Sequence, residues 1–521
     1  MTQLTVENTA SGNGAHGNLP GQLQSPAAPD PVRQELAITY YLSAVKAFES
    51  GDSAVALSLL STALRLNADF YEVHYFLGMI QGCLENFSAA ITHLQRAVTI
   101  NNDSAPAHLL LGKAYCTQGD CQAGIAALRR AHELDPGSIA IICVLSNALA
   151  AAGSPAEGEQ LLNGFSEIGS KDHLWHFTMA MFTQTDRPDT ALFHYQKALA
   201  VNPDYHEAGL NYAILLLSLG LFEQGWKAYE HRIPWLGLNR ELNLFPRWQG
   251  EPLSGKSILV VTEQGFGDSI QFIRYAKLLK EQGATVHVLC SNNLPVRPLI
   301  AAAVGVDNTI VPIEPVPHID WYIPLMSLPL MLGTKLETIP GEPGYFVPDK
   351  TKVKNWQERL KQYAGLKVGI VWSGGRGLKA DSRRSIPFEV FSTLLGVKGV
   401  TFFSLQIGPD ALSAEVLAAL GGALIDLTAL IHDFGDTAAL IENIDLVISV
   451  DTAVAHVAGA LGKPVWTLLY HPPDWRWMRG SDDTPWYPSM RLFRQDATMR
   501  WEPVLERIKQ QLSLYAANSD L

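Results

Sequence analysis

The sequence predicts a multidomain protein in which an all-α helical repeat array is followed by two α/β domains with parallel sheets. The first half shows internal similarity at a period of about 34 residues, typical of helix pairs stacked into a solenoid. The second half contains two turn motifs, G-F-G-D at residues 265–268 and S-V-D-T-A-V-A-H at residues 449–456. Each motif joins a short β-branched run to a helical pattern, which indicates strand–turn–helix units of a parallel sheet.

Composition narrows the class of protein. The chain has 521 residues, of which 47% are hydrophobic and 17% are charged, as in ordinary globular proteins. Its net charge of −12 argues against nucleic acid as a main partner. Residues 1–34 are rich in Gly, Ser, Asn and Pro without the pattern of a signal peptide, so we expect a disordered tail.

No segment of the sequence predicts a membrane span or a metal cluster. No apolar run reaches the roughly 18 residues that a membrane-crossing helix needs. The five cysteines form no C-x-x-C pair and show no zinc spacing with histidine. We therefore expect reduced cysteines in a cytoplasmic protein.

The repeat array is predicted over residues 35–232. Small residues recur at the eighth and twentieth positions of its units, as at Gly112 and Gly124, and allow paired helices to approach closely. The fourth unit diverges most, with Phe165 where neighbouring units have Ala. The six units begin at Ala37, Tyr71, Ala105, Ile139, Asp172 and His206.

Two roles for the array remain open at this stage. Solenoids present concave surfaces that hold a peptide or protein. The alternative is a scaffold that only packs on the second half of the chain or self-associates into a homo-oligomer.

The second half divides into a connector at 233–255 and α/β domains at 256–349 and 350–521. Strands are predicted at 258–262, 285–289, 368–372, 401–405, 424–426, 446–450 and from 465. Helices are predicted at 269–282, at 437–442 with Asp436 as its cap, after Thr452, and at 501–514. The segment 462–464, G-K-P, is expected to end the helix that carries His456.

The first turn motif offers a base and a close approach of the backbone to a ligand. Gly265 and Gly267 bring N–H groups near a substrate, since neither has a side chain in the way. Asp268 fits a general base that deprotonates an acceptor hydroxyl, or a helix cap. Glu263 is the reserve candidate for the base.

The second α/β domain offers groups that suit a nucleotide diphosphate. Asp451, Thr452 and the helix start that follows suit ribose hydroxyls and phosphates. His456 either contacts the diphosphate or is an ordinary helix histidine. Two roles fit Trp475, Trp477 and Trp486 equally well. They could be platforms on which a sugar or base stacks, or they could be ordinary core residues.

A second loop with glycines precedes a cluster of cations. Ser373, Gly374 and Gly375 form a loop suited to anions. Transfer of a sugar from a nucleoside diphosphate leaves a negatively charged diphosphate. Either a metal or a basic side chain must stabilise that charge. Because no D-x-D metal motif stands out, we expect a metal-independent mechanism that uses cations from the set Arg384, Arg383, Lys379 and Arg376. The alternative is that these residues form a solvated basic loop.

Residues 256–514 resemble glycosyltransferase family 9, the heptosyltransferase-like enzymes. The motifs that carry the resemblance are those at 265–268 and 449–456, R-R-S-I-P at 383–387 and, more weakly, Y-H-P at 470–472. Residues 37–232 resemble tetratricopeptide repeats. The resemblance implies a GT-B fold of two Rossmann-type domains and inverting transfer without metal.

The same resemblance implies roles for particular residues. It makes Asp268 the catalytic base and places Arg384 where a phosphate-binding lysine is usual. Ala453 stands where glycine is commoner, and the segment 256–348 is short for an acceptor-binding domain. The residues expected to hold the nucleotide sugar are Gly265, Gly267, Ser373, Gly374, Arg384, Gln406, Thr428, Asp451, Thr452, Ala453 and His456.

The sequence therefore favours an inverting, metal-independent glycosyltransferase of hexosyl or heptosyl type. Its donor would be a nucleotide sugar, and its repeats would recruit a protein or glycan acceptor in place of the shortened domain. The main alternative is a catalytically degenerate scaffold that binds nucleotide sugars or proteins. A nonhydrolysing sugar-nucleotide epimerase is the third possibility, because it shares the two-domain fold.

Overall fold

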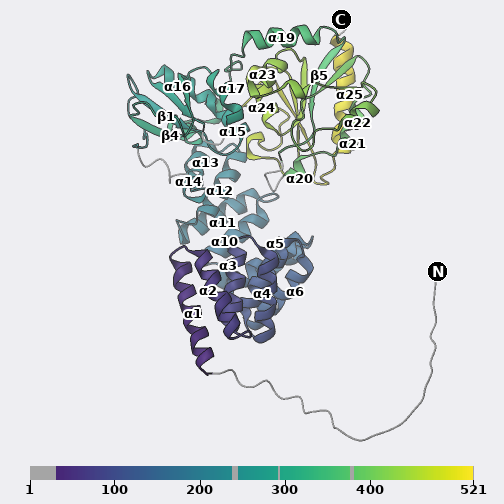
Figure 1. The fold of residues 1–521 in the computed structure, drawn as a ribbon. Coiled ribbons are helices and arrows are strands. Elements are labelled where there is room, and N and C mark those ends of the chain that lie inside the picture. The colour runs from purple at the N-terminus through teal and green to yellow at the C-terminus, as the bar shows by residue number, and fades with distance from the viewer. Residues whose placement is uncertain (1–30, 238–244, 291–293, 376–380, 520–521) are drawn as a thin grey trace, which may run out of the picture. The chain divides into compact units, whose positions relative to one another are not determined.

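The computed structural model describes residues 31–237, 245–290, 294–375 and 381–519 (Figure 1). The chain forms two compact units, residues 1–166 and 167–521, which are described separately. Most of the predicted tail lies outside the described residues. Helix α1 begins at Pro31, so the boundary predicted at residue 34 is too late by about one helical turn.

The described part of the first unit consists of antiparallel helix pairs. The predicted starts Tyr71, Ala105 and Ile139 are each the first residue of a helix. Ala37 instead lies inside α1, where it is fully buried. The helices are α1 (Pro31–Glu49), α2 (Ser53–Leu66), α3 (Tyr71–Cys83), α4 (Phe87–Ile100), α5 (Ala105–Gln118), α6 (Cys121–Leu134), α7 (Ile139–Ala151) and α8 (Pro155–Gly164).

Small residues set the distance between paired helices, as predicted. A Cβ atom added to Gly112 would lie 2.9 Å from the carbonyl oxygen of Gly124 and 2.5 Å from Cγ of Leu128. A Cβ atom on Gly124 would lie 2.3 Å from Sγ of Cys116. Helices α5 and α6 therefore touch through backbone at a place that tolerates no side chain.

The fourth repeat differs where its sequence diverges. Helix α8 has 10 residues, whereas α2, α4 and α6 have 14 each. It ends before Phe165, whose ring packs edge-on against His132 at a centroid distance of 5.7 Å. A four-residue helix, α9 (Ser166–Gly169), follows.

The second unit begins with the last repeats. Asp172 caps the fifth repeat, since its carboxylate accepts hydrogen bonds from the N–H groups of Leu174 and Trp175. The final helix lies partly within the predicted connector, so the helical region extends to Trp235. The helices are α10 (His173–Thr183), α11 (Pro188–Val201), α12 (His206–Ser218), α13 (Phe222–Tyr229) and α14 (Arg232–Trp235).

A four-stranded parallel sheet follows, in the order β3-β2-β1-β4. Its strands are β1 (Ser257–Val261), β2 (Thr285–Leu289), β3 (Asn308–Ile310) and β4 (Trp321–Pro324). The helix predicted at 269–282 is two helices, α15 (Phe266–Phe272) and α16 (Ala276–Glu281), joined by a 3-10 turn at Ile273–Tyr275. Two short helices, α17 (Arg297–Ala301) and α18 (Leu328–Met331), complete this domain.

The last domain contains a six-stranded parallel sheet in the order β10-β9-β8-β5-β6-β7. Its strands are β5 (Leu366–Val371), β6 (Val400–Ser404), β7 (Leu424–Asp426), β8 (Leu446–Val450), β9 (Val465–Leu469) and β10 (Met490–Arg494). The edge strand β10 was not predicted. The helices are α19 (Lys350–Leu360), α20 (Asp381–Arg384), α21 (Phe388–Phe391), α22 (Ala414–Ala419), α23 (Phe434–Ile441), α24 (Ala453–Leu461) and α25 (Glu502–Ser519).

One predicted helix cap was wrong. Asp433 caps α23 by accepting the N–H of Asp436 at 2.9 Å. Asp436 instead accepts the N–H of His432 and pairs with Lys352. The C-terminal end of α24 is as expected, since Gly462 follows the helix in the left-handed conformation with φ 77°.

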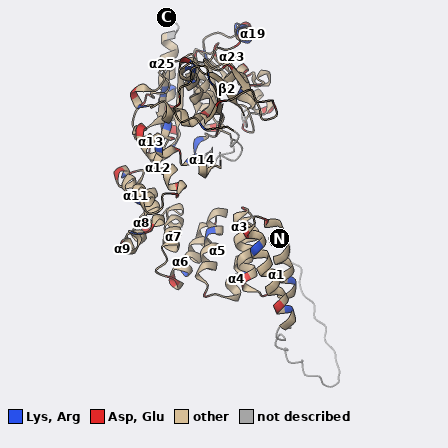
Figure 2. Ribbon diagram, turned by 90° about the vertical axis from the view of Figure 1, so that its left-hand side faces the viewer, with Lys and Arg blue, Asp and Glu red and all other residues tan. Residues whose placement is uncertain are grey.

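One hydrophobic core joins the last repeat to both sheet domains within the second unit. Trp226 of α13, Ile258 of β1 and Trp475 of the last domain belong to a single cluster of buried residues. Figure 2 shows Lys and Arg interspersed with Asp and Glu along the described helices. Among the described residues, no helix combines the length and apolar character that crossing a membrane requires.

Replacing Gly112 with Ala should destabilise the first unit. The added methyl would meet the Gly124 carbonyl, and overpacking of this kind costs about 1–3 kcal/mol. The matched control is Gly82→Ala in α3, where a Cβ meets no atom within 4 Å and helix propensity favours alanine. Chemical unfolding followed by circular dichroism measures both. Equal stability of the two variants would contradict the close packing of α5 and α6.

The repeat helices of the second unit should lose stability in acid. His176 Nε2 donates to the carbonyl of Ser170, so its Nδ1 accepts from Nδ1 of His194 at 2.9 Å. Burial, followed by the effect of His176, lowers the pKa of His194 to about 4. The unfolded chain therefore binds more protons between about pH 6.5 and 4, and stability falls as pH falls through that window.

Thermal unfolding at a series of pH values tests this dependence. His194→Asn should flatten the curve between about pH 6.5 and 4. The exposed His318 serves as the control position, and His318→Asn should leave the curve unchanged. An unchanged curve in His194→Asn would show that this pair does not govern the acid response.

Candidate functional site

Both turn motifs lie where the strand order of a sheet reverses. In the first sheet the chain leaves β1 toward β2 and β3 on one side and later adds β4 on the other. In the second sheet the reversal falls between β5 and β8. Ligands of open α/β sheets bind at such points, beyond the carboxyl ends of the strands. The motif at 265–268 follows β1, and the motif at 449–456 follows β8.

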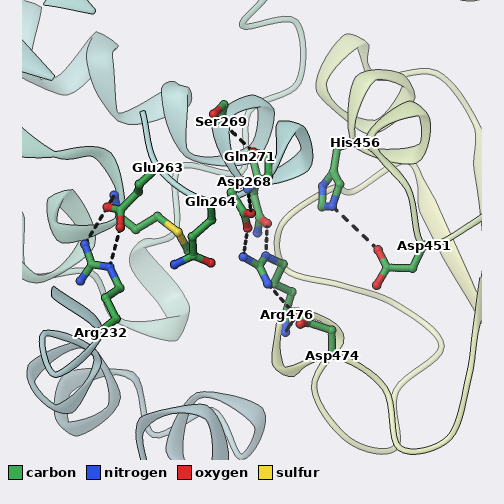
Figure 3. A network of polar contacts seen from close by, with 12 residues as sticks. Arg232, Glu263, Gln264, Asp268, Ser269, Gln271, Asp451, His456, Asp474 and Arg476 are labelled. Carbon is green, nitrogen blue, oxygen red and sulfur yellow. Dashed lines mark hydrogen bonds and ion pairs between the residues drawn. The ribbon is translucent and has the colours of Figure 1, made fainter. Parts of the chain in front are cut away.

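Asp268 bonds back to the start of its own helix and also meets a cation. Its Oδ2 accepts the N–H of Gly265 at 2.7 Å. Gly265 is the N-cap residue of α15 and Asp268 its third helical residue, so Asp268 is not the predicted N-cap but bonds back to it. Its Oδ1 accepts from the guanidinium of Arg476, which comes from the other α/β domain (Figure 3). Burial raises the pKa of Asp268, while Arg476 and the Gly265 N–H oppose that rise. A carboxylate with a raised pKa is a stronger base, so the predicted catalytic role stays compatible with this hydrogen bond.

Arg476 was missed as a functional residue. In the sequence, the segment 474–477, D-W-R-W, was considered only for its tryptophans. Arg476 is buried, and its guanidinium donates to Gln271 Oε1 at 2.9 Å and Asp474 Oδ1 at 2.8 Å besides Asp268 (Figure 3). An arginine flanked by two tryptophans is a signal of a buried cation, because aromatic rings pack on guanidinium planes.

Asp451 follows the end of β8 in the second domain. The indole Nε1 of Trp477 donates to its Oδ2 at 2.9 Å. Burial, then the charge of Asp474, raises the pKa of Asp451 to about 6. Its carboxylate is therefore poised to take or release a proton near neutral pH.

His456 closes the contact between the two motifs. Its Nδ1 shares a hydrogen bond with the hydroxyl of Tyr487 at 2.9 Å, and its Nε2 lies 3.9 Å from Asp451 Oδ1 (Figure 3). Its ring stacks on Trp477 at 5.3 Å. Burial and then Arg476 lower its pKa well below the usual value, so the ring is neutral. Contact with a diphosphate stays a prediction.

Thr452 and Ala453 begin the helix after β8. Thr452 is the N-cap residue of α24, and its hydroxyl shares a hydrogen bond with Ser449 at 2.9 Å. Ala453 is the first helical residue. The first N–H groups of a helix lack partners within it, so this end of α24 suits an anion.

Arg384 reaches the same place from α20. Its Nη1 donates to the backbone carbonyl of Asp451 at 2.9 Å. Gly374 permits this position, because a Cβ there would lie 2.4 Å from the Arg384 guanidinium. Arg383 is exposed, and the predicted cations Arg376 and Lys379 lie outside the described residues.

The loop after β5 is tied down by side chains. The backbone N–H of Ser373 donates to Gln406 Oε1 at 2.9 Å, and that of Gly374 donates to Ser385 Oγ at 3.1 Å. Ser373 Oγ donates to Asp410 at 2.6 Å. These two N–H groups are therefore engaged with protein atoms and not directed at an anion, contrary to the predicted cradle. Gln406 shapes this loop through its amide oxygen.

Thr428 lies farther along the sheet. It follows β7, which is the edge strand beyond β6, and its N–H donates to Asp426 Oδ1 at 2.9 Å. The β8 motif lies on the other side of β5. Thr428 is thus not brought next to Asp451 in the strand order, although both follow carboxyl ends of strands.

Glu263 is committed to a buried ion pair. Its two carboxylate oxygens accept from Nε and Nη2 of Arg232, at 2.9 and 2.7 Å, and one also accepts the N–H of Met326 (Figure 3). Arg232 comes from the last repeat and is fully buried. This favours a structural role for Glu263 over that of a reserve base.

The next residue, Gln264, adds a second link to the repeats. It has φ 61°, a left-handed conformation that is uncommon without glycine. Its side-chain amide donates to the hydroxyl of Tyr229 in α13 at 3.1 Å. The turn that carries Gly265, Gly267 and Asp268 therefore rests on the last repeat.

Two family models match the two parts of the chain. The model of glycosyltransferase family 9 (heptosyltransferase) matches residues 428–499, which include Asp451, His456 and Arg476. A tetratricopeptide repeat model matches residues 41–105 and 83–139. Both parts of the predicted resemblance are thereby confirmed.

Individual proteins are also similar to this chain. Protein FlbA of Caulobacter vibrioides is 28% identical over 340 residues, which cover 59% of this chain and 55% of FlbA, so the chain spans about half the length of that relative. Among solved structures, the tetratricopeptide repeat protein TTC0263 of Thermus thermophilus is 21% identical and covers 35% of this chain, with 99% of TTC0263 matched and a TM-score of 0.31. YrrB, a tetratricopeptide repeat protein, is 14% identical over 34% of this chain and 91% of YrrB, with a TM-score of 0.25.

Gly267→Ala should weaken the contact between the two motifs. A Cβ atom there would lie 2.9 Å from Cδ2 of His456, whose ring is held by Tyr487 and Trp477. We expect a loss of about 1–3 kcal/mol in unfolding free energy. Gly375→Ala is the control, because its Cβ meets nothing within 4 Å. Chemical unfolding measures the difference, and a Gly267 variant as stable as the control would contradict this packing.

Proposed function

We propose that this protein is an inverting, metal-independent glycosyltransferase that uses a nucleotide-sugar donor. One observation supports this proposal more strongly than the others do. Two half-buried carboxylates with raised pKa, Asp268 and Asp451, stand at the switch points of two parallel sheets, where Arg476 holds the first and Trp477 the second. Such pairs of titratable groups are a mark of catalytic sites.

Each group has a proposed role in a single displacement. An acceptor hydroxyl oxygen attacks the anomeric carbon of the donor sugar, and Asp268 takes the hydroxyl proton. The bond from that carbon to the diphosphate oxygen breaks, and its electron pair leaves with the diphosphate. Attack opposite the leaving group inverts the anomeric centre. Arg384 and the first N–H groups of α24 stabilise the charge that develops on the diphosphate.

Asp451 and Thr452 are proposed to hold the donor. The Asp451 carboxylate would accept hydrogen bonds from ribose hydroxyls, and this requires its ionised form. Because the pKa of Asp451 is raised to about 6, donor affinity should rise with pH through that value. Hexosyl or heptosyl transfer would be decided by contacts to the sugar.

The repeats are proposed to present the acceptor, a protein or a glycan. Tyr229 of the last repeat contacts Gln264, which lies four residues before Asp268 in the chain. An acceptor bound on the last repeats therefore starts close to the base. A cytoplasmic location is part of this proposal, since the five cysteines of the sequence show no pattern of a disulfide framework.

Asp268→Asn should abolish turnover and keep donor binding. Loss of a general base costs about 10²–10⁴-fold in rate, whereas asparagine preserves capping. The measurement has two stages, thermal shift against a panel of nucleotides and nucleotide sugars, then release of nucleoside diphosphate from the donor that binds. A donor at about 100 times its dissociation constant adds roughly 2.7 kcal/mol to the free energy of unfolding.

Asp349→Asn is the matched control, because Asp349 caps α19 through its carboxylate at an exposed position. It should keep full turnover. Unchanged turnover in Asp268→Asn would remove Asp268 as the base. If no nucleotide or nucleotide sugar stabilises the wild-type protein, the scaffold alternative replaces the enzyme.

A further inference from the structure

Residues 474–479, D-W-R-W-M-R, contact three parts of the second unit; we call them the bridging segment. Arg476 contacts α15 of the first sheet domain, Trp477 contacts Asp451 of the second sheet domain, and Arg479 contacts the repeats. No motif of the sequence assigned a role to these side chains beyond the aromatic rings.

Arg476 fixes the carboxylate of Asp268 through a rigid fork. Its Nε donates to Gln271 and its Nη2 to Asp268, and both partners lie on α15 one turn apart. Its Nη1 donates to Asp474 at 2.8 Å. The guanidinium plane also packs on the ring of Trp475 at 4.5 Å. Because the Arg476 guanidinium is planar and each of its nitrogens has a partner, the Asp268 side chain has little rotational freedom.

The next residue, Trp477, orients the carboxylate of Asp451 in the same way. Trp477 donates to Asp451 Oδ2 and stacks on His456. It is fully buried, so its position is set by packing. One short segment therefore orients the carboxylates of both sheet domains.

The bridging segment also contacts the last two repeats. Trp475 meets the rings of Trp226 and Tyr229 at centroid distances of 5.5 and 6.0 Å. Arg479 donates to the carbonyls of Gln184 and Thr185, between α10 and α11, at 2.9 and 3.0 Å. A shift of either repeat would therefore act on the segment that holds Asp268.

We infer that Arg476 is a positioning residue for the reaction, which orients the Asp268 carboxylate and ties its geometry to the fifth and sixth repeats. This inference rests on the proposed function, since it needs Asp268 to act as a base. Arg476 touches no reacting atom in this scheme. A carboxylate has about four lone-pair sites, so Asp268 retains room to accept a proton from the acceptor.

The charges around Asp268 predict the sign of a pH effect. The groups that face it are Arg476, Asp474 and Glu263, with Tyr229 and the neutral His456 nearby. Arg476 is the largest influence that lowers the pKa of Asp268, and Asp474 raises it. Removing the arginine should raise that pKa further, and removing the Asp474 charge should lower it.

The experiment compares Arg476→Gln, Arg476→Lys and Asp474→Asn in the full-length chain. It uses the nucleotide sugar that stabilises the wild-type protein, with water as acceptor, and measures release of nucleoside diphosphate from about pH 4 to 9. We expect Arg476→Gln to lower kcat at least tenfold and to move the acidic limb of the rate profile up by about one pH unit. Asp474→Asn should move that limb down.

Arg476→Lys separates charge from geometry. It should keep the acidic limb near that of the wild type, but lose kcat, because an ammonium lacks the planar fork. Arg479→Gln is the control in the same segment, and its acidic limb should not move. The donor dissociation constant, measured by thermal shift at each pH, separates titration of Asp451 from that of Asp268, since only the former acts on donor binding.

The outcomes distinguish the inference from the function on which it rests. If the wild-type chain neither binds nor turns over a nucleotide sugar, the proposed function fails. If it does, but both Arg476 variants keep the wild-type kcat and acidic limb, Arg476 is structural and the inference is overturned. Opposite shifts in Arg476→Gln and Asp474→Asn would support it even if one variant is less stable.

Discussion

The buried ion pair between Arg232 and Glu263 is the constraint on which the second unit depends. Arg232 is fully buried, and its guanidinium is satisfied by Glu263, Glu230, Ser327 and the carbonyl of Tyr229. Separating these partners would leave a charge in the protein interior, which is strongly destabilising. The last repeat is therefore fixed to the end of β1, where the turn with Asp268 begins.

From this pair the rest of the site follows by contact. Glu263 fixes the start of the turn, Gln264 rests on Tyr229, and Asp268 reaches Arg476. The second domain meets the turn through His456, whose Cδ2 would lie only 2.9 Å from a Cβ atom at position 267. Helices of the array thus supply part of the hydrophobic packing of the first sheet domain.

Features set by local periodicity were predictable. The period of the repeats follows from small residues such as Gly112, and β2, β7 and β8 end at the residues expected from their apolar runs. Asp436 was misread as a cap because Asp433, three residues earlier, competes for the same helix end. Asp268, Asp451 and His456 could be singled out because each lies in the turn or the first helical turn that follows a strand.

Arg476 could not be found in this way, since its link to Asp268 joins residues 208 positions apart. The same limit applies to Arg232, Gln406 and the edge strand β10, whose roles come from partners distant in sequence. Gln406 was expected to hold the nucleotide sugar, whereas its amide oxygen accepts a hydrogen bond from the loop of Ser373. The sequence pattern thus predicts where candidate site residues lie. Tertiary contacts decide which of their polar atoms are already bonded to other protein atoms.

The left-handed conformation of Gln264 has a consequence for how such chains are recombined. Its backbone is held in that conformation while its side chain bonds to Tyr229, a residue of the array. A hybrid that joined a foreign solenoid at the end of α14 would replace both Tyr229 and Arg232 and deprive the turn of its support. The natural exchange boundary therefore lies upstream of α13, and the last repeat should be inherited with the sheet domains as one cassette.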